Sequence, residues 1–156
     1  MNRIKVEQLD IIEAFESNSP SLTYFLNRES GEIIKVGEDF CPDETVLGID
    51  YFSDSKYIQM PRISDKEGLR IREEYLEHIR NEDLYDKLEE TLLGRGSLKR
   101  FVDLLRAYPA HYQDWMKFKN REIIKIIETW SKELDIELDL VNLPGLNGMQ
   151  ENKKEI

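Results

Sequence analysis

Apolar residues near the start of the chain recur three positions apart, with acidic residues between them. The repeated positions are Val6, Leu9, Ile12 and Phe15. This spacing places the side chains along one face of an α-helix. The pattern predicts an amphipathic helix over residues 5–17, which ends at the turn-forming serines and proline that follow it.

The pattern then changes to one that is typical of strands. Residues 22–26 are aromatic and apolar, a polar turn contains Gly31, and residues 32–36 form a second strand-like segment. Two short segments of this kind around a polar turn predict a β-hairpin. Residues 57–61 predict a further short strand, which Pro61 stops because the residue before a proline avoids the helical conformation.

From residue 64 onward the apolar spacing returns to about three and a half residues, which predicts helices. Ser64 and Glu67 have the spacing of a capping box, in which a hydroxyl and a carboxylate each bond to a backbone N–H. The helix that they start carries Leu69, Arg72, Leu76 and Ile79 along its length. Its alternating charges predict a solvated face, on which the arginines are Arg70, Arg72 and Arg80. Further helices are predicted over residues 83–93, 98–108 and 110–134.

The C-terminal part of the chain adds a strand and an aromatic stripe. Residues 135–142 alternate apolar and acidic side chains, which predicts a strand with one buried face that could join the hairpin. The helix before it carries an aromatic and apolar stripe that we expect in the core rather than in a ligand site. Its members are Trp115, Phe118, Ile123, Ile126 and Trp130.

These elements predict an α+β fold. In it, a small antiparallel sheet, made of the hairpin and short strands, packs against about five helices. A chain of 156 residues is long enough to bury a sizeable core, so we expect a single domain over residues 1–143. Pro144, two glycines and charged residues follow, and residues 144–156 are expected to be a flexible tail.

Composition narrows the classes of function. The net charge of −10 repels nucleic acids and anionic membranes at long range, so neither is an expected partner. No apolar run approaches the roughly 18 residues that a membrane span needs, and no cleavable signal opens the chain. Cys41 is the only cysteine, which excludes a disulfide framework and fits a reducing, cytoplasmic compartment.

Residue spacing predicts neither a metal site nor a catalytic site. His78 and His111 lack a second histidine at a metal-ligand spacing. The acidic residues around Cys41, within residues 38–44, lack the register of a calcium loop, and a solvated loop is the favoured interpretation. Cys41 is expected to be a small buried side chain rather than a nucleophile. We therefore expect no catalytic residue, no metal and no cofactor.

Positive charge gathers where a helix should repel it, in the segment GRGSLKR at residues 94–100. A helix start favours anions, yet Lys99 and Arg100 lie in the first turn of a predicted helix. In one hypothesis, Glu89 and Glu90 at the end of the preceding helix reach across the turn and neutralise three cations, which are Arg95, Lys99 and Arg100. The other hypothesis is an anion-binding site for a phosphate or a carboxylate. Its residues are Arg95, Gly96, Lys99 and Arg100.

Several segments resemble one bacterial protein family. GRGSLKRFVDLL is followed by YPAHYQDWMKFKNREI, and FLNRESGEII and YIQMPRI precede them along the chain. With these motifs, residues 5–132 resemble the small bacterial proteins grouped as uncharacterised protein family 0158, and the glycine–arginine–glycine turn is the most specific element. The resemblance implies a single α+β domain and a bacterial cytoplasmic setting. It implies no activity, so it assigns no role to any residue.

Three functional hypotheses remain open. The leading one is a cytoplasmic, non-enzymatic module that binds or regulates a protein partner, because no recognised catalytic constellation occurs. The second is a protein that binds a nucleotide or RNA phosphate through Arg95, Lys99 and Arg100. A helix-turn-helix, in which Lys99, Arg100 and Arg106 contact phosphates, is a weaker variant because of the net charge. The third is an enzyme that acts on a phosphorylated substrate with these same residues.

Overall fold

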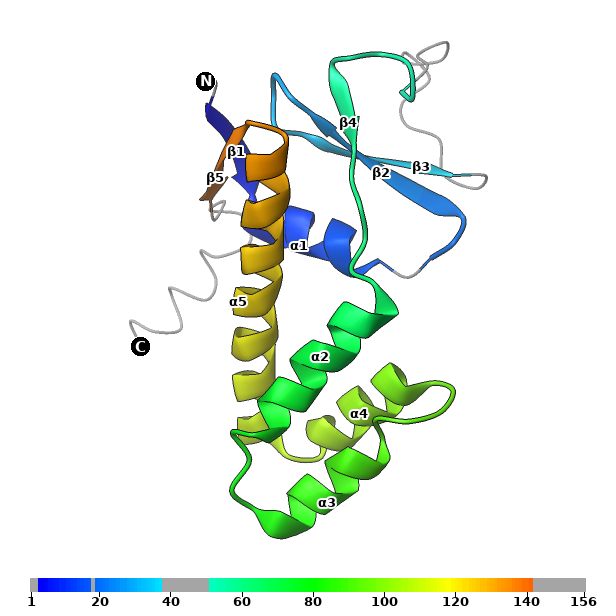
Figure 1. Ribbon diagram of the computed structural model, residues 1–156, viewed down its shortest axis with the longest axis vertical. Helices are drawn as coiled ribbons and strands as arrows, with labels where there is room; N and C mark the ends of the chain where they lie inside the picture. The colour runs from blue at the N-terminus through cyan, green and yellow to red at the C-terminus, as the bar shows by residue number, and fades with distance from the viewer. Residues whose placement is uncertain (1–2, 18, 38–50, 142–156) are drawn as a thin grey trace. The chain divides into compact units, whose positions relative to one another are not determined.

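A computed structural model describes residues 3–17, 19–37 and 51–141 of the chain. These residues form five α-helices and five β-strands, which confirms the predicted α+β class (Figure 1). The chain divides into two compact units. We call them the sheet unit, Met1–Arg62 with Ile126–Ile156, and the helical unit, Ile63–Lys125. A single domain over residues 1–143 stays a prediction.

The sheet unit starts with a strand that the apolar spacing does not predict. β1 (Arg3–Glu7) buries Ile4 and Val6 and exposes the residues between them, and α1 (Gln8–Glu16) follows without a loop. The prediction of a helix over residues 5–17 is therefore wrong for its first residues. Val6 fits both the two-residue spacing of a strand and the three-residue spacing of the helix, so the pattern extends the helix too far.

β1 pairs in parallel with β5 (Glu137–Val141), from Arg3 opposite Glu137 to Glu7 opposite Val141. The strand predicted over residues 135–142 is confirmed, but it lies in this two-stranded sheet and not beside the hairpin. Parallel strands need a long connection, so no local turn signal announces such a pair. The sequence pattern does not predict this pairing, because it assigns residues 5–7 of β1 to a helix.

The predicted hairpin is confirmed. β2 (Leu22–Asn27) pairs antiparallel with β3 (Ile33–Gly37) on one side and with β4 (Tyr57–Gln59) on the other, in the order β3-β2-β4. Oδ1 of Asn27 accepts the backbone N–H of Glu29 at 2.9 Å, a bond that shapes the turn after β2. The small antiparallel sheet of the predicted fold is thus this three-stranded sheet.

Aromatic side chains contribute strongly to the core of the sheet unit. Phe15 of α1 packs edge-on against the half-buried Trp130, with 5.4 Å between ring centroids. Phe25 of β2 packs against Tyr51 at 5.5 Å. Other buried apolar side chains of this unit include Ile4, Val6, Ile11, Ile12, Ala14, Tyr24, Leu26, Ile58, Met60 and Ile127.

The helical unit contains four helices close to their predicted bounds. They are α2 (Asp65–Leu76), α3 (Glu82–Glu90), α4 (Ser97–Arg106) and α5 (Pro109–Glu133). The residues of α5 after Lys125 belong to the sheet unit. Oγ of Ser64 accepts the N–H of Glu67 at 3.1 Å, which confirms the predicted start of α2.

The core of the helical unit contains Trp115 of α5, as its place on the aromatic stripe predicts. Its ring centroid lies 4.9 Å from that of Phe101 and 5.3 Å from that of Tyr75. The hydroxyl of Tyr75 donates to the carbonyl of His111 at 2.9 Å, and burial raises the pKa of Tyr75 to about 12. Other buried apolar side chains of this unit include Ile71, Leu76, Ile79, Leu84, Leu88, Leu105 and Ile123.

Some predictions fall outside the described residues. They concern the acidic loop with Cys41, at residues 38–44, and the tail at residues 144–156. Within the described ranges, no helix has both the length and the apolar composition that crossing a bilayer requires. Over the same part of the chain, no three side chains of His, Cys, Asp or Glu form a group that could hold a metal ion.

Candidate functional site

The turn from α3 to α4 contains two glycines in the left-handed conformation. Gly94 has a φ of 90° and Gly96 a φ of 68°, values that residues with a Cβ rarely adopt. Gly96 is also the N-cap residue of α4, and no side-chain oxygen caps the first N–H groups of that helix.

Arg100 lies in the first turn of α4 but bonds to the end of α3 and the turn after it. Its guanidinium donates to the carbonyl oxygens of Leu93 and Arg95, and to that of Thr91 at 3.4 Å. Thr91 is the C-cap residue of α3. Carbonyl groups at a helix C-terminus carry partial negative charge, which a cation stabilises. The positive charge of Arg100 is therefore disfavoured by the dipole of α4 but stabilised by the carbonyl groups at the end of α3.

Lys99 is paired within its own helix. Its Nζ lies 2.6 Å from Oδ2 of Asp103, one turn further along α4, and this hydrogen bond holds the pKa of Asp103 below its usual range. Neither Glu89 nor Glu90 pairs with Arg95, Lys99 or Arg100, so the hypothesis that these two acids neutralise the cations is wrong. Nearer partners are available: a carboxylate four residues along the helix for Lys99, and the carbonyls of the turn for Arg100.

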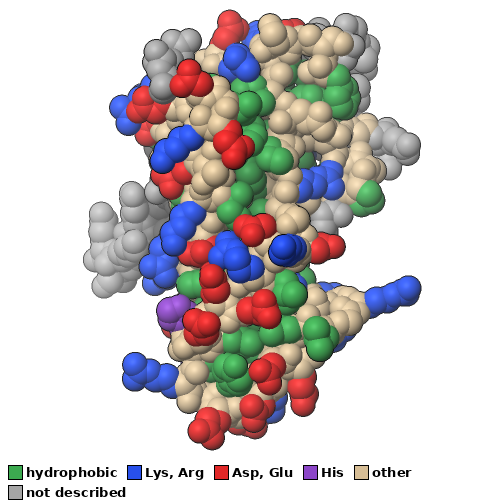
Figure 2. Space-filling view, viewed as in Figure 1, with side chains coloured by type: hydrophobic (Ala, Val, Ile, Leu, Met, Phe, Trp, Pro, Cys, Tyr) green, Lys and Arg blue, Asp and Glu red, His purple; other side chains and the backbone are tan. Residues whose placement is uncertain are grey.

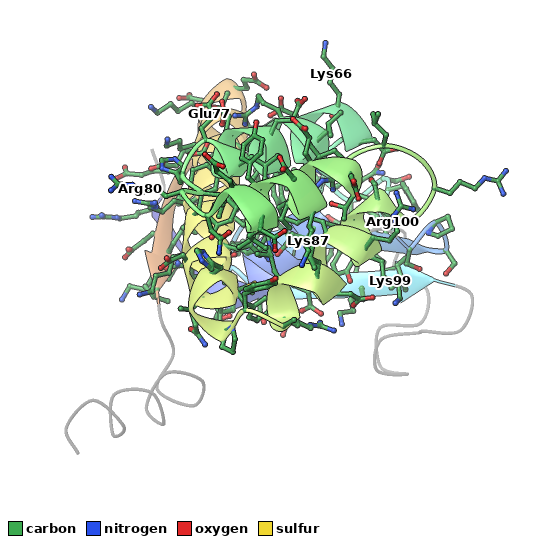
Figure 3. All side chains as sticks on the ribbon, turned by 90° about the horizontal axis from the view of Figure 1, so that it is seen from below. Lys66, Glu77, Arg80, Lys87, Lys99 and Arg100 are labelled. Atoms are coloured by element: carbon green, nitrogen blue, oxygen red, sulfur yellow. The ribbon has the colours of Figure 1, made fainter. Side chains whose placement is uncertain are left out.

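Arg95 lies between the two glycines and its side chain is exposed. This side chain has no hydrogen-bond or ion-pair partner among the residues that the structure describes. Figure 3 labels Lys99 and Arg100, which α4 presents on the other side of the helices from Arg80. Of the predicted anion site, the side chains of Lys99 and Arg100 already have partners, and joint binding by all four residues stays a prediction.

Arg72 of α2 adds to this site, although its surrounding charges predict a solvated position. It is buried, with 7% of its surface exposed. Its Nη2 lies 3.4 Å from Oγ of Ser97, the first residue of α4, and donates to it. Its Nε is also buried and has no hydrogen-bond partner. Arg72, a residue that is more than nine-tenths buried, thus contacts the start of α4 through Nη2 and leaves the Nε donor of its guanidinium unused.

Arg72 has no ion-pair partner among the carboxylates of the described residues. Burial lowers the pKa of its guanidinium, and the attraction of Asp65 and Glu73 from longer range offsets this only in part. The neighbouring arginine of α2 shows what pairing looks like on the same helix. Arg70 lies 2.7 to 3.5 Å from three carboxylates, those of Glu67, Glu74 and Glu122.

The N-terminus of α4 adds to the positive charge at Arg72. The first backbone N–H that bonds within the helix is that of Arg100, which donates to the carbonyl of Gly96 at 3.0 Å. The N–H groups before it have no partner in the helix and together carry roughly half an elementary charge. We call the following group the α4 site: the side chain of Arg72, the hydroxyl of Ser97, and the backbone N–H groups of Ser97, Leu98 and Lys99.

A signal for Arg72 is present in the sequence. Arg72 lies one helical turn before Leu76, and both are buried on the core-facing side of α2. A charged residue on a buried stripe is rare unless it is paired, so the position of Arg72 in the sequence indicates a need for a counter-charge. The acidic residues around Arg72 in the sequence conceal the signal, because they suggest pairs that do not form.

The sequence profile of one protein family, the uncharacterised protein family UPF0158, matches residues 1–143. The matched range includes the whole α4 site and the glycine turn before it. The chain matches no curated protein and no solved structure. The profile match confirms the resemblance that the glycine turn and its flanking segments indicate, and the chain belongs to the uncharacterised protein family UPF0158.

Proposed function

We propose that the protein binds a small oxyanion at the α4 site. The observation that carries this proposal is the buried guanidinium of Arg72, which has no carboxylate partner and lies against the uncapped N-terminus of a helix. Both groups are positive, so neither compensates the other, and each favours an anion. An anion at this place would interact with both.

Arginine cannot relieve the cost of burial by losing its proton. A guanidinium stays charged inside proteins, even where burial lowers its pKa as it does for Arg72. A buried charge that is left without a partner costs several kcal/mol, on the order of 3 to 5. Buried charges are therefore paired as a rule, and a bound anion would supply the partner that the described residues do not.

The α4 site offers an anion three kinds of donor from two helices. Arg72 of α2 supplies a charged planar donor group, and the hydroxyl of Ser97 supplies a neutral one. The backbone N–H groups at the start of α4 supply donors that are aligned with the helix dipole. Because Nη2 of Arg72 lies next to the hydroxyl of Ser97, an anion at the helix start is also within reach of the guanidinium.

This proposal moves the centre of the predicted anion site. Gly96 keeps its place, since as the N-cap residue it leaves the first N–H groups of α4 without a side-chain cap. Arg95 remains an outer, exposed cation. Arg100 instead has the structural role of holding the carbonyls of the turn, and Lys99 pairs with Asp103. The charge that binds the anion comes chiefly from Arg72.

Phosphate binding by the full-length protein tests this function. Isothermal titration calorimetry at low ionic strength gives the affinity of inorganic phosphate for three proteins: the native one, Arg72→Met and Arg80→Met. We expect Arg72→Met to abolish binding. Arg80→Met removes the same charge from an exposed position of the same unit and should change the affinity by less than about twofold. Equal affinities of the two variants, or no binding to the native protein, would contradict the proposal.

A protein partner at the same turn is the second candidate function. Leu93 is 77% exposed and Leu98 is 45% exposed, on either side of the exposed Arg95. Two exposed leucines that flank an arginine offer apolar and positive contacts together. This surface fits a partner segment that presents apolar and acidic side chains, because its charge complements Arg95.

Capture of partners from native cells tests the second candidate. A protein that co-purifies in stoichiometric amount, with and without nuclease, should be lost with Leu93→Ser and with Arg95→Glu. Leu134→Ser, which changes another exposed leucine (40%) in the sheet unit, is the matched control and should retain it. Retention of the partner by the Leu93 and Arg95 variants would show that the turn is not the contact.

We infer a bacterial cytoplasmic setting for either function. The family resemblance and the single cysteine of the chain, Cys41, support this inference. Fractionation of cells that produce the protein at its native level provides the test. The protein should appear in the cytoplasmic fraction, and its recovery from membranes or from outside the cell would contradict the inference.

A further inference from the structure

We propose that the anion selected by the α4 site is a phosphomonoester dianion, the charge and shape of a terminal phosphate group. This inference rests on the proposed function, since it names the class of anion that the α4 site prefers. It separates a terminal phosphate from a phosphodiester and from a carboxylate, all of which a generic positive site would accept.

The charge of the site is larger than a monoanion can neutralise. Arg72 contributes a full positive charge without a carboxylate partner among the described residues. The start of α4 adds roughly half a charge, and the exposed Arg95 lies two residues before Ser97. A phosphomonoester carries about −1.5 to −2 at pH 7, whereas a carboxylate or a phosphodiester carries a single charge. The dianion therefore matches the site best.

The donors of the site also exceed what two oxygens can use. They approach from two helices, the guanidinium from α2 and the hydroxyl and backbone N–H groups from α4. A phosphomonoester has three terminal oxygens, each a strong acceptor, while a carboxylate and a phosphodiester have two. The third oxygen allows the guanidinium, the hydroxyl and the helix start to be bonded at once.

The charge distribution of the chain argues against a nucleic-acid backbone as the source of the phosphate. The helical unit has equal numbers of acidic and basic residues, 13 of each, so the net charge of −10 belongs to the sheet unit. On the face shown in Figure 2, red and blue side chains are interspersed and no extended basic stripe is visible. A polyanion needs such a stripe to follow, whereas one terminal phosphate needs a single local site.

A set of three matched anions tests this inference on the full-length protein by calorimetry at pH 7.5. Methyl phosphate has three terminal oxygens and close to two charges at this pH. Methyl sulfate has the same three oxygens but a single charge, and dimethyl phosphate has two terminal oxygens and a single charge. We expect methyl phosphate to bind at least roughly tenfold more tightly than either of the others. Hydrogen bonds are stronger when the acceptor carries more charge, and one stronger bond of this kind corresponds to about that change in affinity.

Each other outcome of this experiment is decisive. If methyl sulfate binds as tightly as methyl phosphate, the second charge does not matter and the inference is overturned, while anion binding stands. If dimethyl phosphate binds as tightly, the third oxygen does not matter and the inference is again overturned. If none of the three binds, the proposed function fails as well. A short RNA that binds more tightly than methyl phosphate would also overturn the inference.

Arg95→Gln gives an independent test of the charge argument, because this exposed side chain has no described partner whose loss could disturb the fold. The variant should weaken methyl phosphate several-fold and methyl sulfate less, since a dianion loses more attraction than a monoanion when a nearby charge is removed. Lys117→Gln, at an exposed position of α5, is the control and should change neither affinity. Equal losses for both ligands in Arg95→Gln would overturn the charge argument.

Discussion

Each unit of the molecule buries one charged side chain at the start of a helix, among the residues that the structure describes. In the sheet unit this is Glu7 at α1, and in the helical unit it is Arg72 at α4. Each side chain is 7% exposed, and each leaves one buried polar atom without a partner, Oε1 of Glu7 and Nε of Arg72. The sign of the charge separates the structural role of Glu7 from the binding role that we propose for Arg72.

Glu7 agrees in sign with the helix that it starts. It is the N-cap residue of α1, and its Oε2 accepts the backbone N–H of Asp10 at 2.7 Å. A carboxylate at the positive end of a helix is stabilised by the dipole as well as by the hydrogen bond. The burial of Glu7 is thus accounted for within the protein, and no ligand is needed to explain it.

Arg72 belongs to α2 but contacts the start of α4, and its charge has the opposite relation to the dipole of that helix. Its guanidinium faces the start of α4, where a cation is disfavoured by the same dipole that favours Glu7 at α1. A cation near the C-terminus of a helix would be compensated, and Arg100 shows this arrangement at the end of α3. The comparison teaches that the burial of a charge does not by itself indicate a binding site. A buried charge that the nearby helix dipole disfavours is the better indication of one.

The largest expected effect on stability comes from replacing the negative charge of Glu7 with a positive one. Glu7→Lys places a buried cation at the start of α1, where the helix dipole disfavours it and Asp10 is a neighbouring carboxylate that offsets only part of the cost, and should lower the free energy of unfolding by about 3 kcal/mol. Urea denaturation measures this. Glu13→Lys, at an exposed position of the same helix, should cost less than about 1 kcal/mol. Similar losses in the two variants would break the comparison.

The same substitution at both buried charges should act in opposite directions. Glu7→Met removes an N-cap and should lower the free energy of unfolding by about 1 to 2 kcal/mol. Arg72→Met removes an uncompensated charge and should raise it by about 1 kcal/mol or more when no anion is present. Thermal unfolding in phosphate-free buffer shows whether each variant is less or more stable than the native protein. A loss of stability in Arg72→Met would mean that its bond to Ser97 outweighs the cost of its burial.

Arg100→Met sharpens the distinction between a structural cation and a binding one. It removes the bonds to the carbonyls of Thr91, at the end of α3, and of Leu93, in the turn, so the free energy of unfolding should fall by about 1 kcal/mol. Phosphate affinity, measured under conditions where the variant is folded, should stay close to native. An affinity loss as large as that of Arg72→Met would place Arg100 back in the anion site.

The smallest effect concerns the neighbour of the buried carboxylate. Burial, and then the proximity of Glu7, raise the pKa of Asp10 above its usual value. A raised carboxyl pKa contributes stability that is fully present below the ordinary value of about 3.9 and is lost as the pH rises through the folded value. Asp10→Asn should therefore flatten the stability profile from about pH 4 upward and be slightly more stable than native protein at pH 7. Parallel profiles in urea denaturation from pH 3 to 7 would contradict this.

Elements defined by near neighbours could be predicted from the sequence. The hairpin of β2 and β3 and the start of α2 depend on contacts within a few residues, such as that between Ser64 and Glu67. β1 could not be predicted in the same way. Its apolar residues also fit the spacing of α1, and its partner β5 lies at the other end of the described chain. Periodicity shows which face of a segment is buried, but not which distant segment covers it.

The candidate site also has features that near neighbours in the sequence predict and features that depend on distant residues. Gly94 and Gly96 lie in a short turn between two helices, where a left-handed residue is typically glycine, so local chemistry predicts their conformation. The position of the cations at the turn is also visible in the sequence, but their partners are not, because carbonyl groups belong to every residue and leave no pattern. The contact between Arg72 and Ser97 joins residues 25 positions apart on two helices. Only the folded structure brings that pair together.

The pairing of β1 with β5 has a consequence for the order in which the protein folds. The helical unit is one continuous stretch of chain, whereas the sheet unit is assembled from segments on both sides of it. During synthesis, the helices around Trp115 can pack while β5 is still unmade, because domains fold as their residues emerge. β1 finds its parallel partner only after Val141 has left the ribosome. Contacts between residues so far apart in the chain also form slowly, so β1, which is made before the helical unit, is completed only after that unit can have packed.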